Sequence, residues 1–177
     1  MAENKEMVLV DSKDNVTGFE TKQKAHEAKG ILHRAISAFV LNSERQVLIQ
    51  RRSKLKKLWP LFWSNTCCTH PHINETYQQA AERRIFEELG FKCALKLLYK
   101  FEYHADFNGL GAENELCAVL IGRYDGAVKP NADEIAEWKY VGVDELKRDM
   151  AKNPDAYTPW FRMEFERISR EFAAELR

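Results

Sequence analysis

Asn65-Thr66-Cys67-Cys68-Thr69-His70-Pro71-His72 leads directly into residues 75–91, and these two segments say most about the fold of this chain. The second segment carries apolar side chains at helical spacing, with Asn74 as the expected N-cap and Gly90 as the expected stop. Thiol and imidazole groups therefore stand directly before a helix that ends in two adjacent carboxylates. That order gathers proton-transfer groups and metal ligands at one place.

The helix has the spacing of a Nudix box, whose pattern is Gly-x5-Glu-x7-Arg-Glu-apolar-x-Glu-Glu-x-Gly-apolar. The matching residues are Glu75, Arg83, Ile85, Glu87, Glu88, Gly90 and Phe91. Thr69 stands at the position of the first Gly, and Arg84 replaces the Glu of the Arg-Glu pair. Exchanging a carboxylate for a cation lowers the capacity for divalent ions. The sequence thus favours binding of a diphosphate over its cleavage.

Imidazoles and carboxylates elsewhere in the chain form a second candidate site. The set is His26, His33, His70, Glu113 and Glu115. Glu113 and Glu115 are two residues apart, so on a strand their side chains point to the same side. A single histidine is more often a surface or core residue than a ligand. Three neutral nitrogens with two carboxylates suit a five- or six-coordinate divalent ion such as Zn, Mn or Mg.

Basic residues cluster just before the thiol stretch. Residues 51–57 hold five cations in seven positions and lead into the aromatic segment 58–63. A charge run by itself is usually a solvated loop, but its position here favours a local anion site. The whole chain has 27 basic and 27 acidic residues and no net charge. This balance argues against general binding to nucleic acids or membrane surfaces, which needs an excess of one sign.

The 177 residues are enough for one sizeable core, and nothing resembling a linker divides them. Strands are expected at 6–11, 35–41, 46–50, 93–105, 115–124 and 137–142, and helices at 75–89, 143–150 (capped by Asp144) and 160–176. Strands and helices alternate without strict βαβ repetition. The expected fold is therefore α+β, a mixed β-sheet sandwich flanked by helices, in a single domain over residues 1–177. Residues 1–30 are expected to give a strand and a segment that closes over the site.

Cysteine spacing and hydropathy indicate the cellular compartment in which the protein is expected. The four cysteines show no Cys-x-x-Cys spacing, and no run of about 18 apolar residues occurs. The N-terminal residues lack an apolar signal region. We expect reduced thiols and a soluble, cytoplasmic protein, as a monomer with a dimer as the alternative.

Taken together, these motifs are similar to those of the type 1 isopentenyl diphosphate:dimethylallyl diphosphate isomerases, which belong to the Nudix superfamily. The resemblance runs from about Val8 to the C-terminal helix. It rests on Leu32-His33-Arg34-Ala35, Arg51-Arg52, Lys56-Lys57-x-Trp59-Pro60, Trp63 to Pro71, the altered box, Glu113-Asn114-Glu115-x-Cys117 and Pro159-Trp160. Cys-Thr-His-Pro replaces the Cys-Gly-His-Pro of typical bacterial members. The resemblance implies a Nudix-like sheet and an isomerase of small prenyl diphosphates.

The resemblance also implies a role for each site residue. Cys68 is the active-site cysteine, and Glu115, assisted by Tyr103, is the catalytic glutamate, while Trp160 is the indole that faces the developing cation. One tightly bound divalent metal (Mn, Zn or Mg) is expected on His26, His33, His70, Glu113 and Glu115. The expected diphosphate contacts are Lys22, Arg52, Lys56 and Arg84, with Glu88 helping to bind a Mg2+ carried by the substrate.

Moving the double bond requires a proton added at C4 and another removed from C2, through a carbocation-like species at C3. We expect Glu115 with Tyr103 to add the first and Cys68 to remove the second. Two alternatives remain at this point. One is a Nudix pyrophosphohydrolase, against which Arg84 argues. The other is a binding module in which the His/Cys cluster holds a structural zinc ion.

Overall fold

The structure, a computed structural model, describes residues 6–177. Its centre is one mixed β-sheet, in which β3 (His33–Leu41) runs parallel to β8 (Ala112–Arg123). Both strands are buried along almost their whole length, which is typical of strands covered on two faces. The other strands are β1 (Glu6–Val10), β2 (Val16–Thr21), β4 (Gln46–Arg52), β5 (Trp63–Ser64), β6 (Cys67–Thr69), β7 (Leu95–Asp106) and β9 (Ile135–Gly142).

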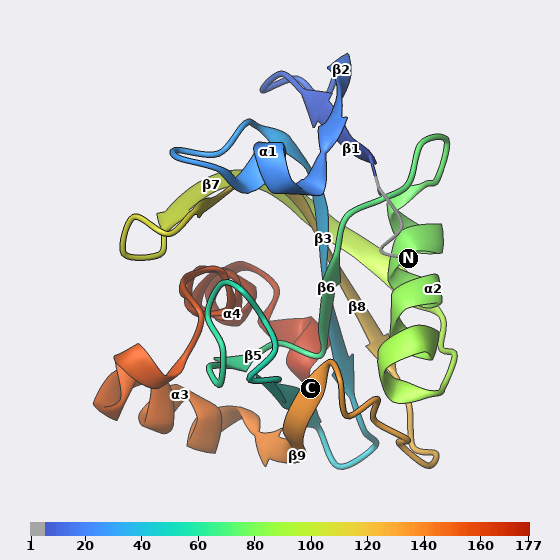
Figure 1. Cartoon of the computed structure of the whole chain (residues 1–177). Helices are drawn as coiled ribbons and strands as arrows, with labels where there is room; N and C mark the ends of the chain where they lie inside the picture. The colour runs from blue at the N-terminus through green and yellow to red at the C-terminus, as the bar shows by residue number, and fades with distance from the viewer. Residues whose placement is uncertain (1–5) are drawn as a thin grey trace.

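Helices cover both faces of this sheet (Figure 1). On one face lies α2 (Tyr77–Leu89), whose Ala81, Ile85 and Leu89 pack with the even-numbered residues of β3. On the other face lie α3 (Val143–Lys152) and α4 (Pro159–Glu171), whose apolar residues pack with the odd-numbered ones. The α+β mixed-sheet fold expected from the sequence is confirmed.

The N-terminal segment contains two strands and a short helix, where one strand and a closing segment were expected for residues 1–30. β1 pairs with β2 as an antiparallel hairpin, and α1 (Lys22–His26) follows β2 directly. β1 also pairs with β3 through Leu9 and His33, so the hairpin is part of the sheet. The first five residues of this segment lie outside the described residues.

The predicted helix α2 is correct, but its start is not. Thr76 is the N-cap, and its side chain forms a capping box with Gln79. Asn74 instead has φ of 66° and lies in the preceding turn. Gly90 ends the helix as predicted, with φ of 74° in the left-handed region that favours glycine.

Two other helix predictions and one turn prediction need correction. Gly142, not Asp144, is the N-cap of α3, and Asp144 lies in the first turn. The C-terminal helix expected over 160–176 ends at Glu171 and is followed by a 3-10 turn, Ala173–Leu176. The turn expected around the thiols contains the short strand β6, which pairs with β3.

Candidate active site

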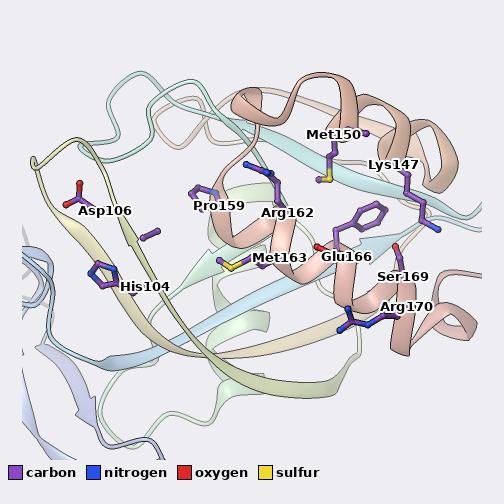
Figure 2. A pocket seen from close by; sticks show the side chains of 13 residues that line it. His104, Asp106, Lys147, Met150, Pro159, Arg162, Met163, Glu166, Ser169 and Arg170 are labelled. Carbon is purple, nitrogen blue, oxygen red and sulfur yellow. The ribbon is translucent and has the colours of Figure 1, made fainter.

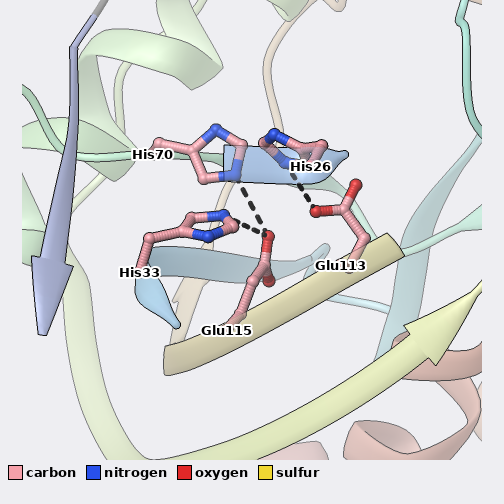
Figure 3. A group of neighbouring side chains, drawn as sticks. All are labelled: His26, His33, His70, Glu113 and Glu115. Carbon is pink, nitrogen blue, oxygen red and sulfur yellow. Dashed lines mark hydrogen bonds and ion pairs between the residues drawn. The ribbon is translucent and has the colours of Figure 1, made fainter. Parts of the chain in front are cut away.

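The expected metal ligands converge at one end of the sheet. His26 ends α1, His33 begins β3, His70 follows β6, and Glu113 and Glu115 lie on β8. One ligand atom from each lies within 4.8 Å of the ligand atoms of the other four. The structure thus brings together all five residues predicted for the tight metal (Figure 3).

The imidazoles are already oriented for a cation. Nδ1 of His26 lies 2.7 Å from the carbonyl of Lys22, and Nδ1 of His33 lies 2.6 Å from that of Ile31. Because each Nδ1–H donates to a carbonyl, each Nε2 presents a lone pair to the cluster. His26 Nε2 lies 2.9 Å from Glu113 Oε2, so a protonated His26 forms an ion pair with this carboxylate, while the buried His33 Nε2 has no hydrogen-bond partner among the described residues. A buried site of this kind fits a divalent ion.

The charges of this cluster depend on one another. Burial and neighbouring His26 lower the pKa of His33 to about 4, so its imidazole is neutral at pH 7. Burial also opposes ionisation of Glu113, but the hydrogen bond and charge of His26 lower its pKa. The pKa of Glu115 is raised by burial and by the charge of Glu113. A bound cation would favour ionised carboxylates and neutral imidazoles together.

Glu115 connects the metal cluster to a proton donor. Its Oε1 lies 3.1 Å from His70 Nε2, and its Oε2 accepts a 2.6 Å hydrogen bond from the Tyr103 hydroxyl. Burial and the charge of Glu115 raise the pKa of Tyr103, so the phenol stays protonated. The predicted partnership of Tyr103 with Glu115 is present in the structure.

The two adjacent thiols point to opposite faces of the sheet, as successive residues of a strand do. Cys67 is fully buried in the core against α2, and Cys68 packs on the face that carries α4. Cys68 Sγ donates to Asn65 Oδ1 at 3.0 Å and lies 3.4 Å from Ser37 Oγ. Burial and the nearby Glu164 raise the pKa of Cys68 to about 12. Cys68 is not a member of the five-residue metal cluster, which contains no cysteine.

A chain of hydrogen bonds links Cys68 to the predicted indole. The Trp160 Nε1–H donates to Ser64 Oγ at 3.2 Å, and Ser64 Oγ donates to Asn65 Oδ1 at 3.0 Å. Asn65 Oδ1 therefore accepts hydrogen bonds from both the Ser64 hydroxyl and the Cys68 thiol. No role was predicted for Ser64 or Asn65, although the polar run Ser64-Asn65-Thr66 between apolar residues was a usable signal.

The four predicted diphosphate contacts lie near one another. Burial lowers the pKa of Lys22, and the charges of Lys56, Arg84 and Arg52 lower it further. This mutual repulsion between cations favours the binding of an anion among them. Glu134, which the sequence analysis missed, contacts both Lys56 and Arg84 in this site.

Arg52 and Trp160 are in contact, which the sequence analysis did not predict. The guanidinium carbon lies 5.3 Å from the centre of the indole ring. Its nitrogens donate to the carbonyls of Trp59 and Leu58. The loop that presents these carbonyls is unusual, since Trp59 and Leu61 both have positive φ. Arg52 therefore fixes this loop and covers part of the indole.

Arg84 occupies the acidic part of the altered Nudix box. Its guanidinium contacts Glu88 at 2.8 Å, Glu134 at 2.8 Å and Glu87 at 3.0 Å. Burial disfavours the charged form of Arg84, but Glu88 and Glu134 outweigh it and raise its pKa. A cation of the chain itself thus neutralises carboxylates that would otherwise be available to metal ions. Glu88 also accepts from Gln50, and it lies outside the five-residue metal cluster.

A groove with a volume of about 860 Å³ lies elsewhere. It runs between α3, α4 and the tip of β7, and its lining includes His104, Met150 and Arg162 (Figure 2). None of the residues predicted for the site lines this groove. Among the helices of residues 6–177, none has both the length and the apolar character needed to cross a membrane.

Comparisons with known proteins identify the family of this chain. The NUDIX domain family matches residues 31–161. An isopentenyl-diphosphate Delta-isomerase of Pectobacterium atrosepticum is 41% identical over 92% of this chain and 90% of its own length. One from Burkholderia multivorans is 40% identical over 91% of each chain.

A crystal structure from Deinococcus radiodurans has the same fold, with a TM-score of 0.68, 24% identity, and coverage of 83% of this chain and 89% of that one. A MutT protein structure from Methanosarcina mazei gives a TM-score of 0.65 at 18% identity, over 79% of this chain and 94% of that one. At these identities the structures support the fold alone. The isomerase relatives, at about 40% identity over almost the full chain, define the family more narrowly. The chain belongs to the NUDIX domain family and, within it, to the isopentenyl-diphosphate Delta-isomerases.

Proposed function

We propose that the protein interconverts isopentenyl diphosphate and dimethylallyl diphosphate, as the names of its relatives indicate for those proteins. The observation that carries this proposal is the placement of two proton-transfer groups on one face of the sheet. Glu115 pairs with His33 on β3, and Cys68 pairs with Ser37 on the same strand. His33 and Ser37 are four residues apart, about 13 Å along the strand. A five-carbon group bound between them would have one proton-transfer group on each side.

The Tyr103–Glu115 pair supplies the proton for C4. The short hydrogen bond from Tyr103 holds the carboxyl in place, and the phenol can return a proton to it. Cys68 accepts the proton from C2. A thiol whose pKa is raised to about 12 gives a strong base once it is ionised. In the reverse direction the same thiol protonates C2, and the carboxylate removes the proton from C4.

The carbocation-like species at C3 needs stabilisation without a nucleophile. Trp160 is 3% exposed and packs beside Tyr103, with 6.2 Å between the ring centres. An indole face stabilises a cation by about 2 kcal/mol when water is excluded. Trp160 is positioned for this role by its hydrogen bond to Ser64. α1, which brings His26 to the cluster, covers the same end of the sheet and helps to exclude water.

The cluster of His26, His33, His70, Glu113 and Glu115 would hold one divalent metal, which would fix Glu115 and lower its proton affinity. Lys22, Arg52, Lys56 and Arg84 would bind the diphosphate. Glu88 would contact a Mg2+ that enters with the substrate. The diphosphate would then take over part of the pairing that Glu134 gives Arg84 and Lys56 in this structure.

A turnover assay tests the proposal. Purified protein with Mg2+ should convert isopentenyl diphosphate to dimethylallyl diphosphate, and in D2O the product should carry deuterium in its new methyl group. Release of inorganic phosphate or pyrophosphate without isomerisation would instead support the pyrophosphohydrolase alternative. The cytoplasmic location and the monomeric state stay predictions from the sequence.

A further inference from the structure

Two carboxylates contact the same nitrogen of Arg84, and they are held in different ways. Arg84 Nη2 lies 2.8 Å from Glu88 Oε1 and 2.8 Å from Glu134 Oε2. The Glu88 side chain is only 4% exposed, and its other oxygen accepts a 3.0 Å hydrogen bond from Gln50 Nε2. The Glu134 side chain is 23% exposed. A ligand that reaches Arg84 can therefore displace Glu134 more easily than Glu88.

The Glu134 side chain joins two of the residues expected to bind the diphosphate. Its Oε2 contacts Lys56 Nζ as well as Arg84 Nη2. The main chain of Glu134 is fixed by other contacts: its carbonyl accepts from Ser53 N at 2.9 Å, and its N–H donates to the Asn131 carbonyl at 3.0 Å. Rotation of the Glu134 side chain would thus free both cations without moving the loop.

We propose that Glu134 is an internal competitor of the substrate diphosphate and thereby sets how tightly the site binds substrate and product. The identity of the displaced ligand rests on the proposed function. In the free protein the Glu134 carboxylate occupies Lys56 and Arg84. The diphosphate has to displace this carboxylate, so its apparent affinity is reduced by the fraction of molecules in which the two cations are free.

A tethered carboxylate also makes the site selective for highly charged ligands. The main chain holds Glu134 beside its two cations at a high effective concentration. A free anion with a single charge gains no more from these cations than the carboxylate that it would replace. A diphosphate carries more charge and can also contact Lys22 and Arg52. When the diphosphate product leaves, Glu134 returns to the two cations, which favours release.

A purely structural role for Glu134 predicts the opposite effect on binding. If Glu134 only held Lys56 and Arg84 in position, its removal would free both side chains and weaken the binding of a diphosphate. Internal competition predicts that the same removal strengthens binding. The direction of the change in affinity therefore separates the two roles.

The test compares Glu134→Gln and Glu134→Ala with Glu137→Gln. Both Glu134 variants remove the competing charge, and alanine excludes a new hydrogen bond from glutamine to the ligand. Glu137 lies on β9, pairs with Arg51 and has a 54% exposed side chain, so Glu137→Gln controls for the loss of one negative charge. The first readout is the Kd of inorganic pyrophosphate with Mg2+, measured by isothermal titration calorimetry. It should fall by about tenfold in both Glu134 variants and stay within about twofold of wild type in Glu137→Gln.

The second readout is steady-state turnover of isopentenyl diphosphate. In Glu134→Gln the KM should fall by about tenfold and kcat/KM should rise, whereas loss of a structural contact would lower kcat/KM. A pyrophosphate Kd that rises or stays unchanged in both Glu134 variants would refute internal competition. Pyrophosphate binding does not require turnover. An inactive wild type whose Glu134 variants bind pyrophosphate more tightly would therefore refute only the proposed function.

Discussion

At the scale of single residues, two neighbouring thiols should behave differently. Cys68→Ala removes the group that we propose exchanges the proton at C2, and it should lower kcat by about 10²- to 10⁴-fold. Cys67→Ala removes a thiol that is 0% exposed on the opposite face of the sheet, and it should leave kcat unchanged while lowering stability by about 1 kcal/mol. Turnover assays with circular dichroism as a fold check measure both effects. Full activity in Cys68→Ala would exclude the role given to this thiol.

Arg84 distinguishes this altered Nudix box from the usual pattern, which has a carboxylate at this position. Arg84→Lys keeps the charge but not the planar fork that contacts Glu88 and Glu134 together. Loss of one charge-assisted hydrogen bond to the diphosphate should raise KM about tenfold, with a smaller change in kcat. Arg170→Lys, on an exposed arginine of α4, is the matched control. Equal KM values for the two variants would show that Arg84 is not a substrate contact.

At the scale of elements, the β1–β2 hairpin should depend on one aspartate in its turn. Asp14, with φ of 67°, contacts Arg34 at 2.7 Å, Lys100 at 2.6 Å and the Tyr77 hydroxyl at 2.9 Å. These contacts connect the hairpin to β3, β7 and α2. Asp14→Asn tolerates the left-handed backbone but loses both ion pairs, and it should cost about 1–2 kcal/mol. Asp14→Ala should cost more, since it also adds backbone strain.

The pH dependence gives a direct check on Asp14. Burial opposes its ionisation, but the hydrogen bonds from Lys100, Arg34 and Tyr77 outweigh it and lower its pKa. A carboxylate with a lowered folded pKa contributes stability above its ordinary value near 3.8, and this contribution is lost as the pH falls through the folded pKa. The stability difference between wild type and Asp14→Asn should therefore shrink below pH 4. Hydrogen exchange in β1 and β2 should increase in the variant at pH 7.

The elements predictable from sequence were those with a long periodic pattern. The spacing of the box and Gly90 located α2, but the capping box of Thr76 and Gln79 displaced its start from Asn74. The strands β5 and β6 have two and three residues, which is too short for a pattern, and they exist only because β4 and β3 pair with them. Local sequence patterns do not predict such tertiary pairing.

The residues of the candidate site were likewise only partly predictable from the sequence. The five candidate metal ligands belong to recognisable motifs, and the structure brings them together. Ser37 and Glu164 carry no motif, and their burial depends on the packing of α4 on the sheet. Glu164 did give a local signal, a charged residue within the apolar stripe of a helix. The sequence does not show which residues of the sheet face Glu164, so this signal could be interpreted only with the structure.

At the scale of the whole molecule, metal binding should be coupled to stability. The ligand cluster places three imidazoles and two carboxylates within 4.8 Å of one another, and His33 Nε2 is buried without a hydrogen bond among the described residues. A chelator should therefore lower Tm, by roughly 5–10 °C if the loss is about 3 kcal/mol, and added Mn2+, Zn2+ or Mg2+ should restore it. His33→Ala should abolish tight metal retention, measured by elemental analysis, and make Tm insensitive to chelator. His104→Ala, outside the cluster, should retain the metal.

Stability should also fall with rising pH because of the buried carboxyl on α4. An acid whose folded pKa, about 8 for Glu164, exceeds its ordinary value of 4.5 binds more protons in the folded state between these values. Unfolding then becomes easier as pH rises through this window, by about 1 kcal/mol per pH unit for this group. Glu164→Gln removes the slope, so the variant should match the wild type near pH 4.5 and exceed it increasingly up to pH 8. Urea unfolding at several pH values measures the difference, and Glu166→Gln on the exposed side of α4 should not change the wild-type slope.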